Sequence, residues 1–140
     1  MSRYALQQSQ IRSARQPVVM VVEDDILIRF PIAEHLRGLR FTVIEAGSGA
    51  EAIDLLRSFD DSIDVVFTDV QMPGLIDGVG ILRWIIEHDP GIYVILTSGD
   101  ANAIDAAAAY AGQAMFVPKP YRIEEIANCV RSFLAEGAPR

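Results

Sequence analysis

Cysteine is scarce in this sequence, with Cys129 alone among 140 residues. A single thiol cannot form an intramolecular disulfide, so we expect a reducing compartment and a cytoplasmic location. The sequence also lacks an apolar run near the roughly 20 residues that a membrane helix requires. Its first residues contain no apolar signal core. Membrane insertion and export are therefore not expected.

Basic residues are outnumbered by acidic ones. The chain has 12 Lys and Arg against 19 Asp and Glu, which gives a net charge of −7. Proteins that bind the phosphate backbone usually carry a basic patch, and the sequence shows none, so direct nucleic-acid binding is not expected. The acidic excess suits a metal-dependent site instead. A chain of this length fits one domain with a sizeable core.

The hydrophobic pattern predicts one domain between two tails. Residues 1–17 are predicted to form a polar N-terminal tail, residues 18–135 the domain, and residues 136–140 a C-terminal tail. The expected strands are Val18–Val22, Phe41–Glu45, Ile63–Thr68, Ile92–Leu96 and Ala114–Val117. The expected helices, one after each strand, are Ile26–Leu39, Gly49–Phe59, Val79–His88, Ala101–Ala111 and Ile123–Leu134. This alternation predicts an α/β fold with a doubly wound parallel sheet and helices on both faces.

Two local expectations refine this outline. In the helix Ile26–Leu39, the side chains of Ile28, Ile32 and Leu36 have the spacing of one buried face. Ser48 is expected to cap the helix that follows it, because its hydroxyl can accept a hydrogen bond from the first turn.

Polar side chains stand at the ends of four expected strands. They are Glu23 and Asp24 after the first strand, Asp69 after the third, Thr97 and Ser98 after the fourth, and Lys119 after the fifth. The carboxyl ends of parallel strands share one edge of the sheet, where ligands gather. A lone aspartate there is more often a helix cap. Acidic, hydroxyl and ammonium groups together are hard to assign to packing alone.

The residue types at this edge point to phosphoryl transfer. Three carboxylates repel one another and resist joint ionisation. A hard divalent cation offsets that repulsion, and Mg²⁺ with oxygen ligands fits. Asp69 can then act as a nucleophile and form an acyl phosphate. Lys119 would supply positive charge to the phosphoryl oxygens, and Thr97 a hydrogen bond.

Four stretches carry a resemblance to a known family. They are Val21-Val22-Glu23-Asp24-Asp25, Thr68-Asp69-Val70-Gln71-Met72-Pro73-Gly74, Thr97-Ser98-Gly99 and Val117-Pro118-Lys119-Pro120. Over Val18 to Leu134 the chain resembles the receiver domain of bacterial two-component response regulators, the CheY-like superfamily. Each motif alone is weak, but all four in this order are highly specific. The resemblance implies a flavodoxin-like fold with strand order 2-1-3-4-5.

The resemblance also implies a role for each matching residue. Asp69 matches the phosphoacceptor, and Lys119 matches the family's lysine, whose bond to the following proline is usually cis. The implied Mg²⁺ ligands are Glu23, Asp24, Asp69 and the backbone carbonyl of Gln71. The implied switch residues are Thr97 and Phe116.

Three positions depart from the family pattern. Glu23 stands where aspartate is commoner, and its longer arm favours contact through water or a shifted metal. The loop Gly74–Gly78 looks one residue longer than usual. Phe116 lacks the hydroxyl of the frequent tyrosine, so an inward ring leaves no polar group to satisfy.

The resemblance implies a phosphorylation-dependent switch rather than an enzyme in the usual sense, since the domain catalyses only its own phosphotransfer and dephosphorylation. A histidine kinase or histidine phosphotransfer protein would be the donor. The expected output surface, made by Ala101–Ala111, Ala114–Val117 and Ile123–Leu134, would bind an unknown partner or a second copy in a phosphorylation-dependent dimer. No output domain follows Leu134, so we expect a stand-alone receiver; a piece of a hybrid kinase or larger regulator is the alternative.

Two other functions remain open from the residues. A metal-dependent aspartyl phosphatase of the haloacid-dehalogenase type would need an aspartate two residues after the nucleophile, where this chain has Gln71. A flavin-binding carrier of the same fold would need a hydroxyl- and glycine-rich phosphate loop after the first strand. The acidic run Glu23–Asp25 occupies that place and would repel an anion.

Overall fold

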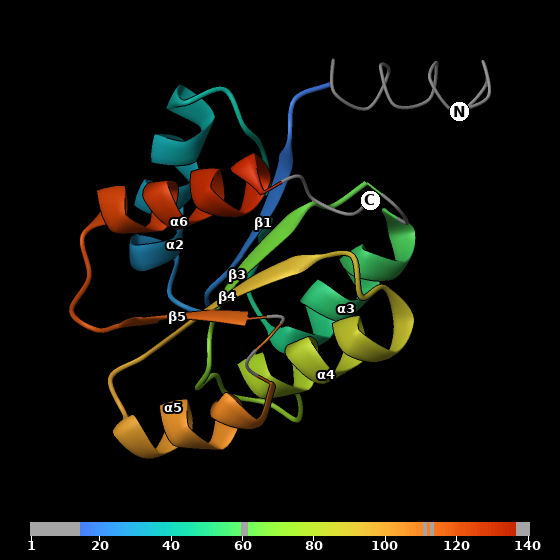
Figure 1. Ribbon diagram of the computed structural model, residues 1–140, viewed down its shortest axis with the longest axis vertical. Helices are drawn as coiled ribbons and strands as arrows, with labels where there is room; N and C mark the ends of the chain where they lie inside the picture. Colours follow the sequence, from blue (N-terminus) through green and yellow to red (C-terminus); the bar gives the residue numbers. More distant parts are fainter. Residues whose placement is uncertain (1–14, 60–61, 111, 113, 137–140) are drawn as a thin grey trace.

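Five parallel strands form the centre of the protein. The computed structural model describes residues 15–59, 62–110, 112 and 114–136. The strands are β1 (Val18–Val22), β2 (Thr42–Ala46), β3 (Val65–Asp69), β4 (Tyr93–Ser98) and β5 (Ala114–Pro118). They lie in the order β2-β1-β3-β4-β5 (Figure 1). The predicted flavodoxin-like strand order is therefore confirmed.

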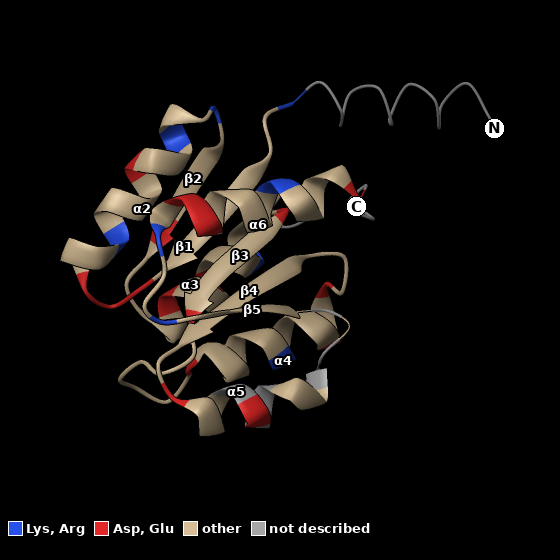
Figure 2. Cartoon of the chain, turned by 60° about the vertical axis from the view of Figure 1, so that its left-hand side comes forward, with Lys and Arg blue, Asp and Glu red and all other residues tan. Residues whose placement is uncertain are grey.

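Helices cover both faces of this sheet. They are α2 (Ile26–Gly38), α3 (Gly49–Ser58), α4 (Gly78–His88), α5 (Ala101–Ala107) with the 3₁₀ turn η1 (Ala108–Tyr110), and α6 (Ile123–Ala135). Helices α2 and α6 lie on one face, and α3, α4 and α5 on the other (Figure 2). Among these helices, none is long and apolar enough to cross a membrane.

The core has two layers because successive strand residues point to opposite faces. Met20 and Val66 pack with the buried sides of α3 and α4, whereas Val21 and Phe67 pack with those of α2 and α6. Both faces of β1 and β3 are covered, so these strands are continuous apolar runs rather than alternating ones.

The fourth strand is longer than the sequence predicts. It extends to Ser98 because Thr97 pairs in register with Asp69 on one side and Val117 on the other. The helix after it is shorter than Ala101–Ala111, since regular α-helix ends at Ala107 and a 3₁₀ turn follows. An alanine-rich segment offers few large side chains to bury, which is what stabilises most protein helices.

The expected buried face of α2 is partly wrong. Ile32 and Leu36 are buried as expected, but the side chain of Ile28 is 40% exposed. Its neighbours Leu27 and Phe30 are 81% and 51% exposed. The first half of α2 therefore presents apolar side chains to solvent.

Acidic and hydroxyl side chains start several of these helices. Ser48 Oγ accepts a hydrogen bond from the Glu51 amide at 3.1 Å, so the predicted cap is confirmed. Asp25 Oδ1 accepts from the Leu27 amide at 2.9 Å. Asp77 Oδ1 accepts from the Gly80 amide at 2.9 Å. Asp25 is thus a helix cap, which explains one acid of the run after β1.

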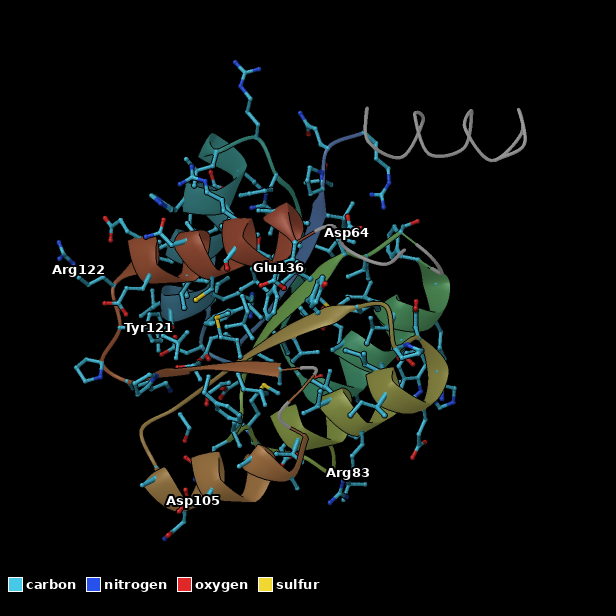
Figure 3. All side chains as sticks on the ribbon, in the orientation of Figure 1. Asp64, Arg83, Asp105, Tyr121, Arg122 and Glu136 are labelled. Carbon is cyan, nitrogen blue, oxygen red and sulfur yellow. The ribbon has the colours of Figure 1, made fainter. Side chains whose placement is uncertain are left out.

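An ion pair marks the opposite edge of the sheet. Arg15 binds the Asp64 carboxylate through both terminal nitrogens, at 3.1 and 3.0 Å, and the Val18 amide donates to Asp64 Oδ2 at 2.8 Å. Asp64 lies far from Tyr121, which follows β5 at the other end of the strands (Figure 3). Most of the predicted N-terminal tail, residues 1–14, lies outside the described residues. Arg15, near the end of the predicted tail, contacts the domain through Asp64.

Candidate functional site

A carboxylate and an ammonium meet at the carboxyl edge of the sheet. Asp69 ends β3, and Lys119 directly follows β5. Lys119 Nζ lies 2.6 Å from Asp69 Oδ2, although β4 separates the two strands. The Lys119 amide donates to the Ser98 carbonyl at 3.1 Å, which holds its backbone beside β4. The sequence pattern predicted this convergence.

Both oxygens of the Asp69 carboxylate have a partner. Oδ2 faces Lys119, and Oδ1 accepts a hydrogen bond from the Gln71 amide at 3.2 Å. Asp69 is only 5% exposed, so these two contacts largely fix its direction. A carboxylate held at a strand end and beside a cation is arranged to attack an electrophile delivered to that edge.

Gly78 lets the next helix start against the same residue. A Cβ at Gly78 would lie 2.3 Å from the Asp69 carbonyl oxygen and 2.8 Å from Val70 Cα. The Gly78 amide donates to the Val70 carbonyl at 2.9 Å. Because the contacts are with backbone, no side chain can be accommodated there without moving β3. Gly78 therefore sets how closely α4 approaches the Asp69 peptide.

Glu23 and Asp24 follow β1 with different exposure. Glu23 is 5% exposed, whereas Asp24 is exposed. Burial is the main cause that raises the pKa of Glu23, and the negative charges of Asp69 and Asp24 raise it further. The Asp25 amide, which donates to Glu23 Oε1 at 3.3 Å, opposes that shift. The two predicted acids and Asp69 therefore act on one another electrostatically.

This set of acids fits an open metal site rather than a closed one. Across the part of the chain that the structure describes, no three His, Cys, Asp or Glu side chains come together as a metal-binding group. Burial nevertheless disfavours the charged form of Glu23, and the charges of Asp69 and Asp24 add to this effect while Lys119 partly offsets it. A cation offsets that cost, and Mg²⁺ commonly binds through one or two carboxylates while keeping several waters.

Gln71 bridges two loops of the site. Its side-chain nitrogen donates to Asp100 Oδ2 at 3.3 Å, and Asp100 Oδ1 accepts from the Asn102 amide at 2.8 Å in the first turn of α5. The Gln71 side chain is therefore directed to Asp100. The metal-ligand role predicted for its backbone carbonyl stays a prediction.

Thr97 carries a buried hydroxyl beside Asp69. The residue is 1% exposed, and its Oγ1 has no hydrogen-bond partner within the described residues. An unsatisfied buried hydroxyl costs about 1–3 kcal/mol. Phe116 lies on the neighbouring strand, where it pairs with Leu96, and its ring is half-buried. The two predicted switch residues thus lie on adjacent strands, one step apart in register.

Ser98 has a local role in the loop after β4. Its Oγ accepts a hydrogen bond from the Asp100 amide at 3.0 Å. This contact shapes the turn into α5. Ser98 was one of the six polar residues that the sequence placed at strand ends, and the structure gives it a loop-forming bond.

Tyr121 belongs to the surroundings of the site and was missed by the sequence analysis. It is half-buried, and its ring meets Phe67 edge-on with centroids 5.9 Å apart. Burial raises the pKa of Tyr121 to about 12, and the charges of Glu23 and Asp69 add to the shift. The available signal was its place two residues after Lys119.

Comparison with known proteins identifies the class to which this fold and site belong. Residues 19–131 match the family model described as the response regulator receiver domain, and the chain belongs to that family. This membership decides against the aspartyl phosphatase and the flavin-binding carrier, the two alternatives that the sequence left open.

Several relatives and solved structures illustrate the match. The chain is 33% identical over 117 residues to the sensor kinase CckA of Brucella abortus, covering 83% of this chain and 12% of the kinase. It is 34% identical over 109 residues to the DNA-binding transcriptional regulator NtrC of Escherichia coli, covering 77% of this chain and 23% of NtrC. The receiver domain of the hybrid histidine kinase CckA superposes with a TM-score of 0.71 at 30% identity, covering 84% of this chain and 98% of that domain. The chain thus spans a minor part of these curated relatives.

Proposed function

We propose that this receiver domain is a phosphorylation-dependent switch in which Asp69 accepts a phosphoryl group from a histidine kinase or histidine phosphotransfer protein. The observation that carries the proposal is the 2.6 Å contact between Lys119 Nζ and Asp69 Oδ2. It brings a buried carboxylate and a partly exposed positive charge together at the edge where an incoming phosphoryl group would arrive.

The transfer step follows from these two groups. One Asp69 carboxylate oxygen attacks the phosphorus of a donor phosphohistidine and forms an acyl phosphate bond. The P–N bond of the donor breaks, and the imidazole leaves with the bonding electrons. Lys119 exchanges its contact with the carboxylate for one with the phosphoryl oxygens, where its charge stabilises the transition state. The domain resets by hydrolysis and acts on no turnover substrate.

We assign the metal site to Glu23, Asp24, Asp69 and the Gln71 backbone carbonyl. Mg²⁺ there would neutralise charge on the phosphoryl oxygens. The support is the raised pKa of Glu23, which is caused mainly by burial and further by the negative charges of Asp69 and Asp24. Glu23, as the longer acid, would hold the ion through water.

The switch uses Thr97 and Phe116. The Thr97 hydroxyl has no partner in the described structure, so a new phosphoryl oxygen offers it a hydrogen bond. Movement of Thr97 toward Asp69 leaves space into which the half-buried Phe116 ring turns. Burying more of that ring contributes at most about 1.5–3 kcal/mol, enough to shift a two-state equilibrium. The change would be read on the surface of α5, β5 and α6 by a partner or a second copy.

The donor must bring its phosphohistidine to the Asp69 edge. Two exposed apolar side chains lie in the segments that follow β1 and β3 at that edge. Leu27, near the start of α2, is 81% exposed, and Leu75, in the loop before α4, is fully exposed. We infer that these residues contact the donor protein.

Two arrangements of the whole protein remain as proposals. The first is a stand-alone receiver that signals to a separate partner in the cytoplasm. The second is a receiver segment of a hybrid kinase or a larger regulator, which is supported by the matches to the sensor kinase CckA and the regulator NtrC. Size analysis of the native protein separates them, because a hybrid kinase would be several times larger than this chain.

Phosphorylation of Asp69 is tested with acetyl phosphate and Mg²⁺. Asp69→Asn is nearly isosteric and cannot attack, so intact-mass spectrometry should show a phosphoryl adduct in the wild type and none in the variant. Asp54→Asn is the matched control, because Asp54 is an exposed acid on α3. An undiminished adduct in Asp69→Asn would refute the assignment.

A further inference from the structure

Arg29 links three elements next to the acidic loop. It lies one turn into α2, and its side chain is only 15% exposed. Its Nη1 donates to the backbone carbonyl of Glu23 at 2.8 Å, and its Nε donates to Glu45 Oε1 at 3.1 Å. One guanidinium therefore joins α2, the end of β1 and the end of β2.

Both backbone groups of Glu23, the amide and the carbonyl, have hydrogen-bond partners. Its amide donates to the Ala46 carbonyl at 3.1 Å, and its carbonyl accepts from Arg29. Gly47 leaves room for this arrangement, since a Cβ there would lie 3.3 Å from Arg29 Nη1. The peptide between Glu23 and Asp24 is thus held by α2, and the peptide before it, between Val22 and Glu23, is held by β2.

We propose that Arg29 is a positioning residue for the acidic pair. By fixing the Glu23 carbonyl it orients the peptide that joins the two acids, so that their carboxylates are held at the Asp69 edge before a cation binds. The inference rests on the proposed function in one respect, namely that the loop of Glu23 and Asp24 binds a metal ion. It does not require Arg29 to touch the metal or the phosphoryl group.

The chemistry of the side chain supports a specific need for arginine. Two separate nitrogens of one planar group serve two acceptors in different directions, which a lysine ammonium on a flexible stem does not reproduce. Glu45 fixes the guanidinium in turn, because its other oxygen accepts from Arg37 at 3.0 Å. Arg37 also binds the Val43 carbonyl and Glu34, and none of its hydrogen bonds within the described structure goes to the acidic loop.

Arg37 therefore provides a matched control. Arg29→Gln and Arg37→Gln each remove one positive charge and one Glu45 contact from α2, but only the first releases the Glu23 carbonyl. Residues that orient metal ligands typically change metal affinity by about 10–100-fold when removed. We expect Mg²⁺ to bind Arg29→Gln roughly tenfold more weakly, Arg29→Lys to fall between, and Arg37→Gln to match the wild type.

A second readout needs no metal. Hydrogen exchange of the Asp24 and Asp25 amides in the metal-free protein should be faster in Arg29→Gln than in the wild type and unchanged in Arg37→Gln. Thermal melts check that each variant is folded. If Arg29→Gln is unfolded, Glu45→Gln weakens the same guanidinium more mildly and should raise exchange at the loop in the same direction.

The outcomes separate the inference from the function on which it rests. Equal exchange and equal Mg²⁺ affinity in Arg29→Gln, Arg37→Gln and wild type would overturn it and leave Arg29 as a tie between α2 and β2. Absence of Mg²⁺ binding in the wild type itself would overturn the proposed metal site. The metal-free exchange comparison would still decide whether Arg29 orders the loop.

Discussion

The ammonium of Lys119 lies 2.6 Å from Asp69 Oδ2 although Lys119 follows β5 and Asp69 ends β3, two strands that are not neighbours in the sheet. The side chain passes over the end of β4, where the strand finishes in Thr97 and Ser98. The basic side chain that follows β5 is therefore in direct contact with the carboxylate that ends β3.

Replacing Lys119 tests the first consequence of this contact. We expect Lys119→Met to slow phosphorylation of Asp69 by about 10²-fold, the usual effect of removing one group that stabilises transition-state charge. Arg122→Met, which removes an exposed positive charge from the same loop (Figure 3), should leave the rate unchanged. A mass-spectrometric time course with acetyl phosphate measures both. Equal rates in Lys119→Met and wild type would show that the ion pair serves only the fold.

The buried acid Glu23 should make the metal-free fold less stable as pH rises. Its pKa in the folded protein is raised above the ordinary 4.5. At a pH between 4.5 and this raised pKa, the folded chain therefore holds more protons than the unfolded one. Stability contributed by this group is present below 4.5 and is lost as pH rises through the raised value. Glu23→Gln stays neutral and should therefore melt at a higher temperature than the wild type near pH 7 without Mg²⁺.

The melts are repeated at pH 4 and pH 7 with Glu51→Gln as control, since Glu51 is an exposed acid on α3. The advantage of Glu23→Gln should shrink at the lower pH and be absent from the control. A Glu23→Gln protein that is less stable than the wild type at pH 7 would contradict the predicted sign.

Gly78 should tolerate no side chain. A Cβ there would press on the Asp69 carbonyl and Val70 Cα, both backbone atoms, so overpacking should cost about 1–3 kcal/mol or more. Urea unfolding of Gly78→Ala measures the loss. Gly38→Ala is the control, because a Cβ at Gly38 meets nothing within 4 Å and should change stability by less than about 0.5 kcal/mol.

The thiol of Cys129 should react slowly with alkylating reagents. Burial is the larger cause that raises its pKa, and the charge of Glu125 raises it further. Since the thiolate is the reactive form, iodoacetamide at pH 8 should modify the folded protein more slowly than the urea-unfolded one. Glu125→Gln should react faster than wild type. Identical rates in the folded and unfolded chains would rule out a protected thiol.

The sequence predicted the parallel sheet and the Asp69–Lys119 convergence for physical reasons, whereas the order of the strands was implied by the family resemblance. Alternating strands and helices leave few topologies, and parallel strand ends meet at one edge whatever the side chains between them. Neither inference needs to know how helices rotate on the sheet. The burial of Ile28 was predicted wrongly because it depends on that rotation: Ile28 has the spacing of a buried residue, but its side chain is 40% exposed.

Arg29 was missed for a related reason. Its partners are a carbonyl six residues earlier and a carboxylate sixteen residues later, and only the packing of α2 against β2 brings them together. Because every residue has a backbone carbonyl, the sequence does not indicate that the Glu23 carbonyl accepts a hydrogen bond from Arg29. Tyr121 was missed because its relation to Glu23 and Asp69 is electrostatic and links residues that end or follow strands which are not neighbours in the sheet.

The ion pair between Arg15 and Asp64 has a practical consequence for biosensor design. It fastens the chain at the amino ends of β1 and β3, on the edge away from Asp69. A protein immobilised on a chip at this edge of the sheet would present its Asp69 edge to the solution. Phosphoryl donors would then reach Asp69 without steric interference from the support.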